Sequence, residues 1–131
     1  SREEISIGCH SGKIIVSGGL HQGQSTNATA ALICEKIKAD RFLNATDVDG
    51  IYDSDPKKNA KAKMFKEITI KKCLGLLNNE STEAGNYDLM DIVAMKVIER
   101  SKIPTWVIKS DPKVIRNLIM KNSQTGTKIV I

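Results

Sequence analysis

Short apolar runs alternate with longer stretches of helical periodicity along most of the chain. The runs are rich in β-branched residues, which are typical of buried strands. Strands are therefore expected over 13–17, 41–46, 104–109 and 127–131, with a short extended segment within 62–69. Helices are expected over 28–38, 70–79, 88–101 and 113–121. Strands and helices in this alternating order predict an α/β fold with a largely parallel sheet.

Length and composition are those of one folded unit. The 131 residues suit one compact domain or a large piece of a bigger one, and no linker or internal repeat divides them. Residues 1–12 are polar and predict no element. The apolar set is mostly aliphatic, with only five aromatic residues. This palette suits helices packed on a sheet better than a platform for stacking bases.

A basic stretch carries much of the formal net charge of +5. Between Lys57 and Lys72, seven lysines accompany one acid, Glu67. Three interpretations stay open: a solvated surface, long-range attraction of polyanions such as nucleoside triphosphates, or a nucleic-acid-binding module. The last is the weakest, because the lysines lack interleaved aromatic residues and match no nucleic-acid-binding motif.

Cysteine content and hydropathy exclude two classes of protein. Cys9, Cys34 and Cys73 are too few and too scattered for a disulfide framework or a zinc site. Cys34 and Cys73 fall within helical patterns and are expected to be small core residues. The sequence has no apolar run of the roughly 18 residues that cross a bilayer, and no signal-peptide pattern. We therefore expect a cytoplasmic protein without a membrane partner.

The stretch 13–31 joins an expected strand to an expected helix through a glycine-rich loop. Residues 18–27 (GGLHQGQSTN) are small and polar, and Ser25, Thr26 or Asn27 can cap the helix. The free N–H groups at a helix start are a natural cradle for phosphate. The loop matches neither a Walker motif nor a dinucleotide fingerprint. Phosphate binding and an ordinary strand-to-helix turn both remain open.

A second polar segment, 44–56 (NATDVDGIYDSDP), follows another expected strand. Thr46 and Asp47 are expected at the carboxyl edge of the sheet, where open α/β sheets bind ligands. Tyr52 could lie along a purine, and Asp55 could accept hydrogen bonds from ribose or adenine. The acids of this segment lack the downstream glutamate of an EF-hand, so calcium is not expected here. A capped acidic turn without a ligand is the alternative.

The two loops together resemble consecutive signatures of the amino-acid kinase superfamily, above all of its archaeal-type uridylate kinases. VSGGLHQGQST and ATDVDGIYDSDPKKN are similar to that branch's GGTHPGHTTD-like and TNVDGVYTADP-like loops. EAGNYDLMDIVAMKVIERSKIPTWVI resembles its last long helix and following strand, and TGTKIVI resembles its closing segment. The resemblance runs in order from Gly12 onward. It implies a three-layer sandwich in which 1–131 form the C-terminal, ATP-binding part of the kinase domain.

The resemblance also implies an activity and a set of contacts. Family members of this branch transfer the γ-phosphoryl group of ATP, which carries Mg²⁺, to UMP in pyrimidine nucleotide synthesis. The ATP contacts carry over to Thr46, Asp47, Tyr52 and Asp55. The UMP contacts carry over to the first loop: Leu20, His21, Gln22, Gly23, Gln24, Ser25 and Thr26. ATP and UMP are then the partners, without nucleic acid or a metal held by the protein, and the family's common hexamer implies a homo-oligomer.

Two departures from the family pattern bear on catalysis. The family's first loop ends in an aspartate that organises phosphoryl transfer, and Asn27 stands there without the charge. The family's glycine-rich N-terminal segment, with its lysine, has no counterpart in this sequence. Phosphoryl transfer depends on cations around the γ-phosphate, so this piece alone is expected to be inactive. Asn27 also favours the alternative of a non-catalytic nucleotide-binding, storage or regulatory member, and no residue is assigned a catalytic role.

Overall fold

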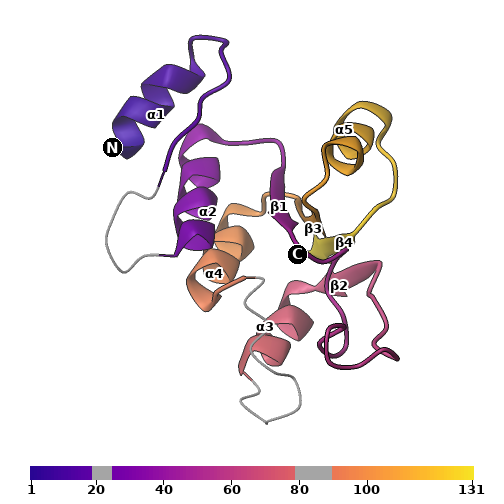
Figure 1. The fold of residues 1–131 in the computed structure, drawn as a ribbon. Coiled ribbons are helices and arrows are strands. Elements are labelled where there is room, and N and C mark those ends of the chain that lie inside the picture. Colours follow the sequence, from indigo (N-terminus) through magenta and orange to yellow (C-terminus); the bar gives the residue numbers. More distant parts are fainter. Residues whose placement is uncertain (19–24, 79–89) are drawn as a thin grey trace.

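Helices and strands alternate through the part of the chain that the computed structural model describes, residues 1–18, 25–78 and 90–131 (Figure 1). The helices are α1 (Arg2–Cys9), α2 (Thr26–Ile37), α3 (Ile70–Asn78), α4 (Ile92–Ser101) and α5 (Pro112–Lys121). The strands are β1 (Phe42–Thr46), β2 (Glu67–Thr69), β3 (Thr105–Lys109) and β4 (Thr127–Val130). These bounds confirm most of the elements expected from the sequence.

The four strands form one mixed sheet in the order β1-β3-β4-β2. β1 runs parallel to β3, with Thr46 in register with Lys109, and β2 runs parallel to β4. The central pair, β3 and β4, is antiparallel, with Trp106 opposite Lys128. Parallel pairing therefore predominates, as the alternating order predicted. Because β3 and β4 are antiparallel, the first residues of β4 lie at the edge of the sheet where β3 ends.

Helices cover both faces of the sheet, which confirms the three-layer α/β architecture (Figure 1). On one face, Val107 and Ile129 join a buried cluster with Met95 and Ile98 of α4. Ile108 points the other way because side chains alternate along a strand. Ile108 and Leu118 of α5 are both buried outside that cluster. The sheet thus lies between a layer of α2, α3 and α4 and the single helix α5.

Polar side chains fix where the helices begin and how two of them meet. Ser25 caps α2 by accepting a hydrogen bond from the N–H of Ala28 at 3.0 Å, so the cap expected within 25–27 is Ser25. Arg100 of α4 donates two hydrogen bonds to the carboxylate of Glu35 in α2, at 2.7 and 2.6 Å. α2 precedes β1 and α4 precedes β3. Each helix runs back along the strand that follows it, so the N-termini of α2 and α4 lie at the edge of the sheet where β1 and β3 end.

The prediction of a strand over 13–17 is wrong for this structure. Residues 14–18 have no regular structure, and Ile14 and Val16 are 96% and 91% exposed. A β-branched run becomes a strand only when another strand satisfies its N–H and C=O groups. Within the described residues, β1 pairs only with β3, and nothing pairs with 13–17. We predicted no element within 1–12, but α1 lies there, and a capping box between Ser1 and Glu4 starts it.

The cysteines behave as the helical patterns predicted. Cys73 of α3 is buried in the core, and burial raises the pKa of its thiol to about 11. Cys34 of α2 is partly buried against the same core, and burial raises its pKa as well. Both thiols are therefore protonated packing groups at neutral pH. Among the residues that the structure describes, no helix has the length and apolar character needed to cross a bilayer.

Candidate functional site

The ends of β1 and β3 and the start of β4 meet at one edge of the sheet. We call this the polar edge and define it by five residues. Thr46 ends β1, Asp47 follows it, Lys109 ends β3 and Thr127 begins β4. Lys57 reaches the same place from the loop that follows Asp47. Ligands of open α/β sheets bind at the carboxyl ends of the strands, so this edge is the first place to look for a site.

Thr46 shapes the chain as it leaves β1. Its Oγ1 accepts a hydrogen bond from the N–H of Val48 at 2.9 Å, which turns the backbone at Asp47. The carbonyl of Thr46 accepts a second bond, from the N–H of Ser110 at 2.6 Å, so the first residues after β1 and β3 are tied together. Asp47 is left exposed at the tip of this turn. The sequence-based placement of Thr46 and Asp47 at the sheet edge is confirmed.

Two lysines converge on Asp47. The ammonium group of Lys57 pairs with the carboxylate at 2.5 Å, and the ammonium group of Lys109 donates to the backbone carbonyl of Asp47 at 2.6 Å. The hydrogen bond and charge of Lys57 lower the pKa of Asp47, and Asp47 in turn raises the pKa of Lys57. Both partners are exposed, so the pair is weak in energy and easily exchanged for another anion. The arrangement places two exposed cations beside one carboxylate.

Tyr52 and Asp55 lie on the excursion between β1 and β2. Tyr52 is half-buried and forms an isolated bridge with Met64, while the N–H of Asp53 donates to the carbonyl of Lys63. Burial and the neighbouring Asp49 raise the pKa of the Tyr52 hydroxyl. Asp55 closes a tight turn, since its carboxylate accepts from the N–H of Lys57 at 2.9 Å. That bond uses the Asp55 oxygen Oδ1.

Thr127 holds this excursion against the sheet. Its buried hydroxyl accepts from the N–H of Ile51 at 2.8 Å and donates to the carbonyl of Phe65 at 2.5 Å. The contact needs close backbone approach. A Cβ on Gly50 would lie 2.6 Å from the Thr127 hydroxyl, and one on Gly126, whose φ is +61°, would lie 2.2 Å from the carbonyl of Val107. The two glycines therefore let the loop after β1 dock on the start of β4.

The first loop, to which the family resemblance assigned the UMP contacts, is only partly within the described residues. Leu20, His21, Gln22, Gly23 and Gln24 lie outside them. Ser25 and Thr26 start α2, and Asn27 lies within its first turn rather than at its cap. One turn on, Thr29 is 4% exposed, and its hydroxyl has no hydrogen-bond partner. The structure thus places the start of α2 at the edge where β1 and β3 end, and the UMP contacts expected of 20–26 remain a prediction.

Sequence reasoning missed three members of the polar edge: Lys57, Lys109 and Thr127. Lys57 was counted only as part of a basic stretch, and Lys109 only as the end of a strand. The role of Lys109 depends on the register between β1 and β3, and Lys57 reaches Asp47 through the fold of the excursion between β1 and β2. A signal for Thr127 existed, because TGTKIVI places a small hydroxyl residue after a glycine at the start of a strand. We used this segment only for the family resemblance and predicted no contact for Thr127.

The acids of the polar edge do not form a metal cage. Among the described residues, no three His, Cys, Asp or Glu side chains come together in a way that would hold an ion. The exposed carboxylate of Asp47 is paired with Lys57. Mg²⁺ is commonly bound by substrate phosphates together with one or two carboxylates. The donor set here fits an ion that arrives on a polyphosphate better than one held by the protein.

Known proteins match this chain in sequence and in structure. A profile described as "Amino acid kinase family" matches residues 1–109. The curated uridylate kinase of Methanococcus aeolicus is 44% identical over 117 residues, which cover 89% of this chain and 52% of that protein. The crystal structure of the uridylate kinase of Archaeoglobus fulgidus superposes with a TM-score of 0.86 at 36% identity, covering 99% of this chain and 58% of that one.

A more distant structural match carries another name. Aspartokinase III of E. coli, crystallised with aspartate and ADP, superposes with a TM-score of 0.60 at 28% identity. The match covers 79% of this chain and 20% of that one. This chain spans about half the length of the curated relatives it matches.

Proposed function

The chain belongs to the amino acid kinase family, and we propose that it forms the ATP-binding part of a kinase that phosphorylates UMP. The observation that carries the proposal is the polar edge, where Thr46, Asp47 and two lysines meet at the carboxyl ends of parallel strands. The names of the relatives from Methanococcus and Archaeoglobus support UMP as the acceptor. The aspartokinase match supports a nucleotide donor site, because that protein was crystallised with ADP.

In the proposed reaction, an oxygen of the UMP phosphate attacks the γ-phosphorus of ATP. A new P–O bond forms as the bond to the β,γ-bridging oxygen breaks, giving UDP and ADP. No protein nucleophile is required, so the work of the chain is to position the substrates and balance charge. Mg²⁺ enters with ATP as part of the donor substrate and neutralises phosphate charge there.

The described residues have distinct parts in this scheme. Thr46, Tyr52 and Asp55 hold adenosine, with the half-buried ring of Tyr52 as an apolar surface and the Asp55 carboxylate as an acceptor. Lys57 and Lys109 exchange Asp47 for the polyphosphate, because both are exposed and only weakly held. Ser25, Thr26 and the N-terminus of α2 face the acceptor phosphate. Leu20 to Gln24 supply further UMP contacts by family resemblance.

A coupled ADP-release assay on the full-length protein tests the acceptor. We expect turnover with UMP and none with acetylglutamate, aspartate, glutamate or carbamate. Turnover with another acceptor, and none with UMP, would overturn the substrate while leaving the donor site intact. Absence of turnover with every acceptor, together with retained ATP binding, would favour the non-catalytic alternative that Asn27 raises. Restoring the charge by Asn27→Asp then discriminates further, since a degenerate site should gain rate.

The wider setting follows from the same proposal. UDP formation places the protein in pyrimidine nucleotide synthesis, which is a cytoplasmic process, and family resemblance gives a homo-oligomer, with a hexamer as the specific expectation. Light scattering on the full-length protein tests the assembly. A monomer at micromolar concentration would contradict it without affecting the catalytic proposal.

A further inference from the structure

A lysine of the same chain covers the carboxylate of Asp47 at the polar edge. The ammonium group of Lys57 pairs with this carboxylate at 2.5 Å. The side chains of Lys57 and Asp47 are 64% and 72% exposed. An ion pair this exposed adds little to the free energy of folding, so it can open when a ligand of higher charge approaches.

The turn that carries Lys57 has an ordered backbone. The carboxylate of Asp55 accepts from the N–H of Lys57 at 2.9 Å. The carbonyl of Asp55 accepts two more bonds, from the N–H groups of the next two residues, at 3.1 and 2.9 Å. The backbone of Lys57 is thus fixed, while its long side chain can turn. Lys109 approaches Asp47 from β3 and donates to its carbonyl at 2.6 Å, so both ammonium groups meet at one residue.

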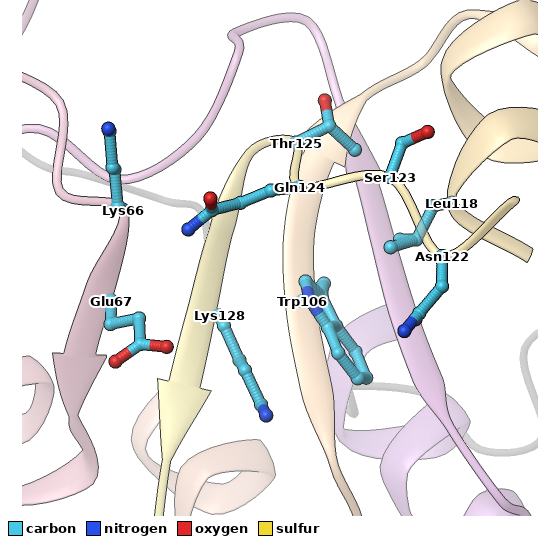
Figure 2. A pocket seen from close by; sticks show the side chains of 9 residues that line it. All are labelled: Lys66, Glu67, Trp106, Leu118, Asn122, Ser123, Gln124, Thr125 and Lys128. Atoms are coloured by element: carbon cyan, nitrogen blue, oxygen red, sulfur yellow. The ribbon is translucent and has the colours of Figure 1, made fainter.

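The cations around a hollow beside Trp106 are arranged differently. Figure 2 shows Lys66 and Lys128 with their ammonium groups at opposite ends of this hollow. Lys128 and Arg41 also lie over the Trp106 ring, 5.4 and 5.6 Å from its centroid. These cations are far apart or already in contact with the ring, whereas the two lysines of the polar edge converge on one residue. The polar edge is therefore the better place for a polyphosphate.

Opening the pair leaves Asp47 as an uncovered negative charge at the polar edge. If Lys57 and Lys109 contact the phosphates of a nucleotide, this carboxylate lies beside them. Like charges at short range repel each other, so binding of a nucleotide without a metal is weakened. A nucleotide that carries Mg²⁺ is less negative, and carboxylates are among the groups that share this ion with substrate phosphates. The same carboxylate therefore repels the metal-free nucleotide and favours the metal-bound one.

We propose that Asp47 and Lys57 together make the donor site selective for the magnesium-bound nucleotide. Lys57 covers Asp47 before the nucleotide arrives and turns to the polyphosphate when it binds. The uncovered carboxylate then faces the cation that the nucleotide carries. The inference rests on the proposed function, because it requires ATP to bind at the polar edge. It does not depend on the identity of the acceptor.

Isothermal titration calorimetry of this chain measures the selectivity. One titration uses ATP with EDTA, and the other uses MgATP at the same ionic strength. The dissociation constant of metal-free ATP divided by that of MgATP gives the magnesium preference. We expect MgATP to bind more tightly than metal-free ATP in wild type. The readout is binding alone, so it does not depend on turnover.

Variants at the ion pair separate charge from shape. Asp47→Asn should tighten metal-free ATP by about two- to fivefold and lower the magnesium preference, because it removes the charge and keeps the size of the side chain. Asp47→Glu should retain the preference. Lys57→Met should weaken both forms of the nucleotide, and more strongly than Lys58→Met, which removes the same charge from the next residue.

Asp40→Asn is the distant control for the acid. Asp40 is exposed and precedes β1, whereas Asp47 follows it. At about 3.3 Å per residue, the two carboxylates are roughly 20 Å apart. That separation exceeds the screening length of about 8 Å at physiological ionic strength. Asp40→Asn should therefore leave the magnesium preference unchanged.

Three results would overturn the proposal and leave the donor site in place. One is equal affinity of wild type for metal-free ATP and MgATP. Another is a magnesium preference that Asp47→Asn does not lower, or that Asp40→Asn lowers equally. The last is a preference as low in Asp47→Glu as in Asp47→Asn, which would assign the effect to shape rather than charge. If wild type bound neither form, the proposed donor site itself would be wrong, and this inference with it.

Discussion

The polar edge and the segment 13–17 both carry clear sequence signals, yet the structure gives them opposite outcomes. At the polar edge, Thr127 ties Ile51 to Phe65, and Lys57 pairs with Asp47. In 13–17, Ile14 and Val16 lie almost fully exposed, and no described strand pairs with them. The difference shows that a sequence motif adopts its expected structure when the residues that it contacts belong to the same packed unit. A strand-like sequence without a neighbouring strand does not become a strand.

The largest effect is expected from Gly126→Ala, because this substitution disturbs the packing at the polar edge. The new Cβ meets the carbonyl of Val107 at 2.2 Å in a backbone conformation that disfavours side chains. We expect the free energy of unfolding to fall by about 3 kcal/mol, at the upper end of ordinary single substitutions. Urea denaturation measures it.

Gly75→Ala is the matched control, because it lies in α3 with open space around its Cβ position. That substitution should stabilise the chain by about 0.5–1 kcal/mol, since glycine is unfavourable inside a helix. Equal stability of the two variants would mean that the start of β4 does not pack on β3 as described.

A smaller loss is expected from Thr127→Val. The substitution leaves the N–H of Ile51 without its acceptor inside a buried contact, at a cost of about 1–3 kcal/mol. The backbone amide of Ile51 should exchange its hydrogen faster in the variant, in line with the lower stability. Thr105→Val is the control, because the hydroxyl of Thr105 is buried to the same degree and donates to the nearby carbonyl of Ile103. A Thr105 variant that disturbs Ile51 as much would show that the contact is not specific.

Lys57→Met should change the pKa of Asp47 more than it changes the free energy of unfolding. Lys57 holds the pKa of Asp47 below its usual range, so the variant should return that pKa toward the ordinary value. A depressed carboxyl pKa stabilises the fold above the pKa of the unfolded chain, and the contribution is lost as pH falls through the folded value. Carbon-detected NMR titration of the Asp47 carboxyl measures the shift. Lys58→Met serves as control. An identical titration of Asp47 in wild type and in Lys57→Met would contradict the ion pair between Lys57 and Asp47.

The smallest effect is expected on the exposed side of the comparison. Val16→Ser should change the free energy of unfolding of this chain by no more than about 0.5 kcal/mol, because Val16 is 91% exposed. Thermal unfolding of the chain checks the value. A cost of 2 kcal/mol or more would show that 13–17 is buried in solution and that the contrast with the polar edge is wrong.

Most elements could be predicted because their determinants are local. The helix over 26–37 has a serine cap followed by alanines, and β1 and β3 are short apolar runs between turn residues. The turn after β1 also follows from local chemistry, since Thr46 bonds to a residue two positions on. Residue identities alone therefore placed Thr46 and Asp47 correctly.

The rest depended on contacts between residues far apart in sequence. Lys109 reaches Asp47 only because β3 pairs with β1 in a particular register. The antiparallel order of β3 and β4 has no local signature, yet it decides that Thr127 lies at the polar edge. Glu67, Trp106 and Lys128 lie side by side across β2, β3 and β4 for the same reason. Such features follow from the assembled sheet.

The central claim is that the polar edge holds the donor nucleotide. Amide chemical shifts of this chain, followed by NMR during a titration with MgATP, test it most directly. We predict saturable shifts at Thr46, Tyr52, Asp55 and Lys57, with Trp106 and Lys128 unmoved. Saturable shifts confined to residues outside 46–57 would contradict the account.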